Sequence, residues 1–137
     1  MEVLIDTNVI MDFLMKREPY AEDAIQIVEL CREKKLKGYV AAHTVPTLFY
    51  ILRKDFSIPQ RRELLNALCR VFEISEINRE KILAALENEK FEDFEDCLQE
   101  ECAVDAVADY IVTRNPKDFS GSRVQVISPS ELLEMLK

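Results

Sequence analysis

The chain has 137 residues, of which 48% are hydrophobic and 32% are charged, and its formal net charge at pH 7 is -8. These values predict one soluble globular domain, residues 1–137, and exclude a disordered chain. The acidic balance excludes a nucleic-acid binder that relies on bulk positive charge, and the 2 glycines are too few for a glycine-rich phosphate loop.

The compartment follows from what the sequence lacks. No apolar run approaches the ~20 residues that a membrane helix needs, and Met1 is followed at once by Glu2 and Asp6, not by a basic leader. No two of the 4 cysteines form a C-x-x-C pair, which argues against a zinc site. We therefore expect a cytoplasmic protein without membrane association.

The first stretch reads as a short buried strand, residues 3–5, that runs directly into Asp6. Polar side chains at residues 6–8 can cap a helix, and an apolar helical pattern starts at Val9 and continues to Leu14. A strand, an acid and a helix start in this order are typical of the carboxyl edge of an open parallel sheet.

The second helix has apolar residues at helical spacing over residues 20–31, and we expect it to end at Gly38. A short strand is predicted at residues 39–42. The next helix is opened by Thr44 and Pro46.

Two further helices carry clear start signals. Residues 57–60 have the spacing of a capping box, and Asn78 is the predicted N-cap of the helix that follows a strand at 71–74. Another helix begins near Asp93 and continues to about Val107.

The last third of the chain contains two more strands, at residues 110–113 and 124–127, separated by a turn at 114–118. Ser128 then caps a final helix. Strands alternate with helices over the whole length, which predicts an α/β fold: a mainly parallel central sheet with helices on both faces, a three-layer α/β/α sandwich.

Acidic residues are concentrated between residues 87 and 109, a stretch that contains ten acidic residues and one basic residue. Such a run is usually a solvated helix face. Asp93 and Asp96, however, share one face at the start of a helix. If the first and fourth strands are neighbours, Asp6, Asp96 and Asp118 converge at the crevice where the chain crosses the sheet.

Convergence of carboxylates requires a partner for their charge. Two carboxylates about 5 Å apart repel by roughly 3 kcal/mol at an effective dielectric of about 20. Either a proton stays on the group, or a cation neutralises it. All-oxygen ligands suit Mg²⁺ or Mn²⁺, which can polarise a phosphoryl oxygen and supply hydroxide for phosphodiester hydrolysis.

Three segments resemble the acidic motifs of PIN-domain nucleases: Leu4-Ile-Asp-Thr-Asn-Val9, Glu92-Asp-Phe-Glu-Asp-Cys-Leu98 and Ala108-Asp-Tyr-Ile-Val-Thr-Arg-Asn-Pro-Lys-Asp-Phe119. Their order and the intervening helices also fit, so the resemblance covers nearly the whole chain. It implies a PIN-like sandwich and a Mg²⁺- or Mn²⁺-dependent endoribonuclease. Many small members are VapC-type toxins, commonly dimeric, with an antitoxin partner.

By this resemblance the metal ligands and catalytic residues are Asp6, Asp96 and Asp118, and Asp93 is a further candidate ligand. Asn115 is either a ligand or a turn-former. Each acid also has a plainer interpretation: Asp6 as a helix cap, Asp96 as a surface acid of a first helical turn, and Asp118 as a turn residue.

One position departs from the family pattern. The family usually has a Glu near the start of the helix after the second strand, whereas residues 43–50 contain no acid and Thr47 stands at that place. The alternative hypothesis is therefore a catalytically impaired PIN-like domain that binds RNA or protein. The candidate substrate contacts are Asn8, Thr47, Asn115 and Arg114, although Arg114 could equally be ordinary surface charge.

Overall fold

The structure is a computed structural model that describes residues 1–137, and its centre is a single sheet of five parallel strands. The strands are β1 (Glu2–Ile5), β2 (Lys37–Ala41), β3 (Glu73–Ser75), β4 (Tyr110–Val112) and β5 (Val126–Ile127). Their order in the sheet is β3-β2-β1-β4-β5, and every neighbouring pair is parallel. The first and fourth strands are neighbours, as the crevice hypothesis requires.

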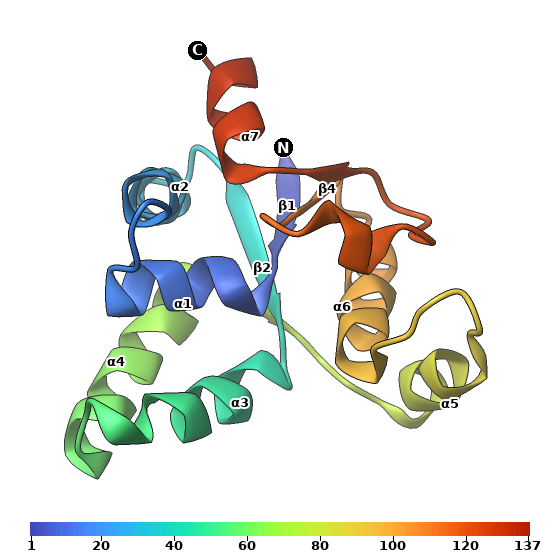
Figure 1. The fold of residues 1–137 in the computed structure, drawn as a ribbon, viewed down its shortest axis with the longest axis horizontal. Coiled ribbons are helices and arrows are strands. Elements are labelled where there is room, and N and C mark those ends of the chain that lie inside the picture. Colours follow the sequence, from blue (N-terminus) through green and yellow to red (C-terminus); the bar gives the residue numbers. More distant parts are fainter.

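Helices cover both faces of the sheet (Figure 1). They are α1 (Thr7–Met15), α2 (Ala21–Arg32), α3 (Thr44–Ile51), α4 (Ile58–Val71), α5 (Arg79–Glu87), α6 (Phe94–Asp105) and α7 (Pro129–Met135), with short 3-10 turns η1 (Leu52–Lys54) and η2 (Pro116–Phe119). One layer contains α1 to α4 and α7; the other contains α5 and α6. The predicted three-layer sandwich is confirmed. No helix has both the length and the apolar character needed to cross a membrane.

Strand β1 has apolar side chains on both faces because helices cover both. Val3 and Ile5 pack into the large core under α1 and α2, while Leu4 points the other way and packs against Cys102 and Ala103 of α6. All five side chains are fully buried. A continuous apolar run is the expected sequence of a strand at the centre of a parallel sheet, and this burial fixes where the chain emerges beside Asp6.

The predicted helix starts are also confirmed. Ser57 and Ser128 each form a complete capping box, and the side chain of Asn78 accepts a hydrogen bond from the backbone N–H of Lys81. Each of these caps satisfies backbone donors that would otherwise be left open at a helix start.

Gly38 does not end a helix, contrary to the prediction. Helix α2 ends at Arg32, and Gly38 lies inside β2. A Cβ atom at this position would stand 2.7 Å from the sulfur of Cys31 and 2.7 Å from a ring carbon of Phe72. Glycine is needed there because α2 and Phe72 pack directly against the strand backbone.

Candidate active site

Asp6 is the first residue after β1, at the carboxyl edge of the sheet. Its backbone N–H donates to the carbonyl of Val112 in β4 at 3.0 Å, which continues the pairing of β1 with β4. Asp6 occupies the N-cap position of α1, yet its side chain makes no capping hydrogen bond. Instead Oδ1 accepts from Nε2 of Gln99 at 3.0 Å, and Oδ2 accepts from Oγ1 of Thr113 at 2.8 Å.

The carboxylate of Asp6 is buried without a cationic partner. Asp6 is 3% exposed, and the two side chains that donate hydrogen bonds to its carboxylate, Gln99 and Thr113, are both neutral. Burial raises the pKa of Asp6, the hydrogen bonds from Gln99 and Thr113 lower it in part, and the negative charge of Asp118 raises it again. No cationic side chain of the protein is thus available to balance a negative charge on Asp6.

Gln99 connects the acids, and the sequence did not point to it. It is 2% exposed on α6, and its Nε2 donates to Oδ1 of Asp6 and, at 3.4 Å, to Oδ1 of Asp96. Its Oε1 accepts from the backbone N–H of Thr7 at 3.2 Å. The available signal was its position three residues after Asp96, which places both on one face of the helix.

The start of α6 carries two more acids. Asp93 is the N-cap, and its Oδ1 accepts from the backbone N–H of Asp96 at 2.9 Å. The pKa of Asp96 is raised to about 7, first by burial and then by the negative charges of Asp93, Asp6 and Asp118. Hydrogen bonds connect Asp93 to Asp96, and Asp96 through Gln99 to Asp6, so acids from distant parts of the chain lie close together.

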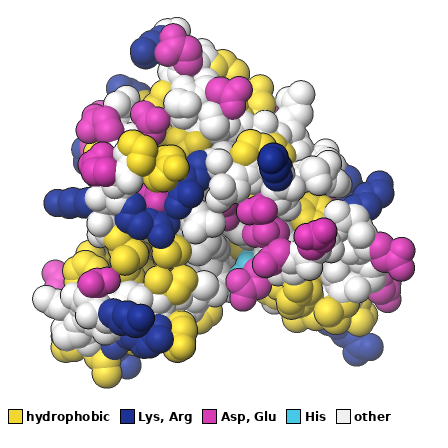
Figure 2. All heavy atoms as spheres, in the orientation of Figure 1, with side chains coloured by type: hydrophobic (Ala, Val, Ile, Leu, Met, Phe, Trp, Pro, Cys, Tyr) yellow, Lys and Arg dark blue, Asp and Glu magenta, His cyan; other side chains and the backbone are white.

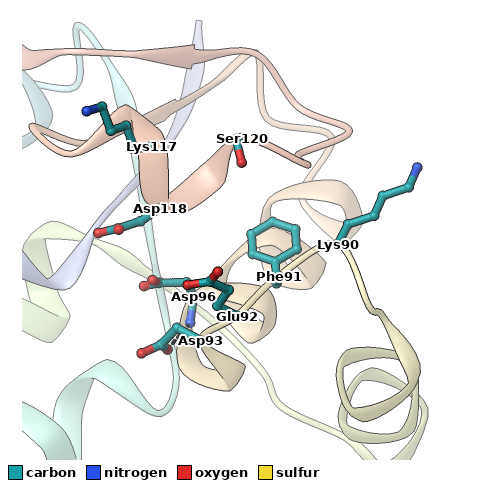
Figure 3. Close-up of a pocket in the computed structure, with 8 residues that line it drawn as sticks. All are labelled: Lys90, Phe91, Glu92, Asp93, Asp96, Lys117, Asp118 and Ser120. Atoms are coloured by element: carbon teal, nitrogen blue, oxygen red, sulfur yellow. Dashed lines mark hydrogen bonds between the residues drawn. The ribbon is translucent and has the colours of Figure 1, made fainter.

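An open cavity of about 550 Å³ lies beside these acids. Its lining residues are Lys90, Phe91, Glu92, Asp93, Asp96, Lys117, Asp118 and Ser120. Figure 3 shows Asp93 and Asp96 on the α6 side facing Asp118 of η2 across the same space, while both lysines extend away from the carboxylates. Asp6 does not line the cavity, but it is joined to Asp96 through Gln99.

Helix α3 begins next to this site. Oγ1 of Thr44, which is fully buried, is 2.9 Å from Oγ1 of Thr7. Nε2 of His43 contacts the carbonyl of Glu95 at 3.1 Å, and its buried Nδ1 has no hydrogen-bond partner; burial lowers the pKa of the ring. Thr47 is half-buried one turn further along α3 and does not line the cavity.

Of the other predicted contacts, Arg114 is held by a different acid. Its Nε donates to Oδ2 of Asp12 at 2.8 Å, and its guanidinium lies 4.2 Å from the ring centre of Tyr20. Nε of Arg17 donates to Oδ1 of the same carboxylate at 2.8 Å. Asp12 is 1% exposed, so this is a buried acid neutralised by two arginines.

Neither Asn8 nor Asn115 lines the cavity. The backbone N–H of Asn115 donates to Oγ1 of Thr113 at 3.0 Å, and its carbonyl accepts from the N–H of Asp118 at 3.0 Å. Asn115 thus shapes the turn that presents Asp118, in line with the turn-former alternative.

An ion pair between buried Glu100 and exposed Arg123 fixes the segment after η2 to α6. Glu100 is fully buried, and it accepts from Nε of Arg123 at 3.0 Å, from Nη2 at 2.7 Å and from the backbone N–H of Arg123 at 2.8 Å. Because Glu100 follows Gln99, the same turn of α6 holds both Asp6 and the segment that follows Asp118.

The chemistry of the donors fits a hard divalent cation. Asp6, Asp93, Asp96 and Asp118 offer only carboxylate oxygens, as Mg²⁺ and Mn²⁺ prefer. No group of three His, Cys, Asp or Glu side chains is already arranged to hold a metal ion. Loading would therefore require these side chains to turn toward a shared ion, and Asp96 would have to lose its proton.

Comparison with known protein families assigns most of the chain to a single family. A family model described as PIN domain matches residues 2–117. No curated protein sequence matches.

Solved structures with this fold include components of toxin–antitoxin complexes. VapBC2 from Rickettsia felis, bound to a DNA fragment from its promoter, is 18% identical with a TM-score of 0.68, covering 93% of this chain and 98% of that one. A toxin–antitoxin complex from Klebsiella pneumoniae is 23% identical with a TM-score of 0.68, covering 93% and 97%. VapBC-1 from nontypeable Haemophilus influenzae is 17% identical with a TM-score of 0.69, covering 95% and 99%.

Proposed function

The chain belongs to the PIN-domain family, and from this premise we propose that it is a metal-dependent endoribonuclease that hydrolyses RNA phosphodiester bonds. One observation carries the proposal. The buried carboxylate of Asp6 has only neutral partners, and it lies beside Asp96, whose pKa is raised to about 7 by burial and by neighbouring acids. A protein gains no stability from such crowding, so a cation is the natural reason for it.

The residues that would hold Mg²⁺ or Mn²⁺ are Asp6, Asp96 and Asp118, with Asp93 as a further ligand. A divalent cation in this place supplies Lewis-acid polarisation of a phosphoryl oxygen and a source of hydroxide near neutral pH. The absence of His and Cys from this set favours these two ions over zinc.

The chain's own residues have separable tasks in this proposal. Gln99 and Thr113 fix both oxygens of Asp6, so that its orientation is set before any ligand arrives. One oxygen of Asp96 is 3.4 Å from Gln99. The pKa of Asp96 is raised to about 7 without a metal, so this carboxyl would give up its proton when a cation binds near neutral pH.

The biological role that we infer is that of a toxin paired with an antitoxin, because several solved structures with this fold are toxin–antitoxin complexes. We further propose that the chain acts as a homodimer. Size-exclusion chromatography with light scattering tests the dimer, and co-expression with adjacent small reading frames tests the antitoxin.

Cleavage of RNA in the presence of Mn²⁺ is the direct test. We expect the wild-type chain to cleave and both Asp6→Asn and Asp96→Asn to lose cleavage while remaining folded by circular dichroism. Glu87→Gln, which changes an exposed carboxylate outside the cavity, is the matched control. Cleavage that survives both site substitutions would contradict the proposal.

A catalytically impaired binding module is the second candidate. It is favoured by the neutral Thr47 where the family usually has an acid, and by the lack of a ready-made metal group. Thermal unfolding with and without Mn²⁺ separates the two functions. A stabilisation by Mn²⁺ that disappears in Asp6→Asn supports the nuclease, whereas an unchanged melting temperature supports the module.

A further inference from the structure

The end of α3, η1 and α4 form a basic lobe in an acidic protein. The lobe carries five cations: Arg53, Lys54, Arg61, Arg62 and Arg70. Only two carboxylates, Asp55 and Glu63, lie in the same part of the chain. The whole chain, by contrast, has 26 acids against 18 bases.

The cations of the basic lobe are free of carboxylates. None of the five forms a salt bridge, although cations elsewhere do so repeatedly, including Arg17, Arg114 and Arg123. Arg53, Lys54 and Arg62 are also exposed. Unpaired and exposed cations on a chain of net charge -8 form a local attraction for polyanions that the net charge hides.

Two of the arginines lie over aromatic rings. The guanidinium carbon of Arg53 is 3.8 Å from the ring centre of Tyr50, and Nη1 donates to the carbonyl of Tyr50 at 2.9 Å. Arg61 lies 4.4 Å from the ring centre of Phe49, and its Nη1 donates to the carbonyl of Phe49 at 2.9 Å. Tyr50 is 63% exposed. Single-stranded nucleic acids bind proteins through aromatic rings that stack on unpaired bases, often with arginine side chains beside them.

Helix α3 joins the basic lobe to the acidic cavity. Its first residue, Thr44, contacts Thr7 beside Asp6, and its last residues lead into Arg53 and Lys54. Eight helical residues are about 12 Å long. Figure 2 shows acidic and basic side chains on the same face of the molecule. Asp and Glu side chains lie near α6, and Lys and Arg side chains lie over the C-terminal end of α3.

We propose that the basic lobe binds the single-stranded part of the RNA next to the cleavage point, and this rests on the proposed nuclease function. Arg53, Lys54 and Arg62 contact phosphates, and the ring of Tyr50 stacks on a base. The lobe thereby holds a polyanion to a protein whose cavity repels it. We expect unpaired RNA and not a duplex, because the bases of a duplex already stack on one another and leave no face for the ring of Tyr50.

The first test measures RNA binding by the full chain in the Asp6→Asn background, so that the probe is not cleaved. A labelled single-stranded RNA is titrated in EDTA by fluorescence anisotropy. The triple variant Arg53→Gln, Lys54→Gln, Arg62→Gln should bind about tenfold or more weakly at ~0.1 M salt, and the slope of log K against log salt should fall by about 2, for three lost phosphate contacts. The matched control, Lys34→Gln, Lys35→Gln, Arg79→Gln, removes the same charge elsewhere and should keep the parent slope.

The second test concerns the ring. Tyr50→Ala should weaken binding of single-stranded RNA about tenfold, Tyr50→Phe should bind as the parent does, and a duplex of the same sequence should not distinguish them. Tyr50 is largely exposed, so neither change threatens folding. The melting temperatures of all variants should be measured to check this point.

Several results would overturn the proposal. One is equal RNA affinity and salt slope in the lobe variant and the control variant; another is polyglutamate binding as strong as RNA, which would indicate a surface for an acidic protein. A failure of the lobe is distinguishable from a failure of the nuclease, because wild-type cleavage in Mn²⁺ is measured separately. Cleavage with an unchanged kcat/KM in the lobe triple variant would reject the lobe and leave the nuclease intact.

Discussion

Two aspartates six positions apart, Asp6 and Asp12, are treated in opposite ways by the same fold. Both are almost completely buried, with exposures of 3% and 1%. Asp12 accepts hydrogen bonds from Arg17 and Arg114, so its charge is cancelled within the protein. Asp6 accepts only from neutral donors.

The difference separates a structural acid from a functional one. An acid whose charge is cancelled by arginines supports the fold and has nothing left to offer a ligand. An acid oriented by an amide and a hydroxyl keeps its negative charge, at some expense in stability, for a group that arrives from outside. Charge balance around a buried carboxylate therefore says more about its role than burial alone.

The largest effect should come from Asp6→Asn. Asparagine keeps the shape and can still accept from Gln99, but it removes the charge that a cation needs. We expect RNA cleavage to fall by about 10³-fold, roughly 4 kcal/mol of activation free energy. The free energy of unfolding in EDTA should change by no more than about 1 kcal/mol, because an uncompensated charge has been removed. Single-turnover cleavage and urea unfolding measure the two quantities.

The reverse pattern is expected for Asp12→Asn. This change leaves Arg17 and Arg114 without their carboxylate, and we expect a loss of about 3 kcal/mol in the free energy of unfolding. Mn²⁺ binding per folded molecule should persist. A variant as stable as wild type would break the distinction between the two aspartates.

Gln99→Glu sharpens the comparison by making the surroundings of Asp6 still more acidic. Glutamate cannot donate to Asp6, and like charge at this buried position should lower the metal-free stability by about 2 kcal/mol. Mn²⁺ should then stabilise this variant more than wild type, since the ion relieves the added repulsion. Gln99→Leu is the control, because it removes the hydrogen bonds without adding charge and should not gain in Mn²⁺ response.

The smallest effect is that of pH on the metal-free protein. The pKa of Asp96 is raised to about 7 from an ordinary value of 3.8, so the folded state holds this proton more tightly than the unfolded state. Stability from this group is complete below about pH 4 and is lost as pH rises through about 7. Because Asp96 is only half-buried, solvent screening limits the loss to about 1 kcal/mol. Melting temperatures in EDTA should fall from pH 5 to pH 8, and Asp96→Asn should flatten the profile.

Local sequence was sufficient for most of the fold. The capping boxes at Ser57 and Ser128 and the apolar strand before Asp6 are decided by neighbours in the chain, and each was predicted correctly. Gly38 was misassigned because its role is set by Phe72, a residue far along the chain that packs on the strand. Contacts of this kind leave no periodic trace in the sequence.

The candidate site was predictable only in its acids. Asp6, Asp96 and Asp118 follow strands or start helices, and the structure brings them to one end of the sheet; their role as ligands stays a prediction. The contribution of Gln99 was invisible, because a neutral amide becomes informative only when its two buried partners are known. Arg114 was predicted to contact substrate, yet its pairing with Asp12 depends on a helix a hundred residues away.

The ion pair of Glu100 with Arg123 has a consequence for anyone trimming this protein. The family match stops at residue 117, but a fragment cut there would strand a fully enclosed acid on α6 without its counter-charge. It would also remove Leu132 of α7 and leave a gap in the core that this side chain fills. The last twenty residues are therefore needed for folding. A fragment without them should be recovered as insoluble protein, not as a smaller folded domain.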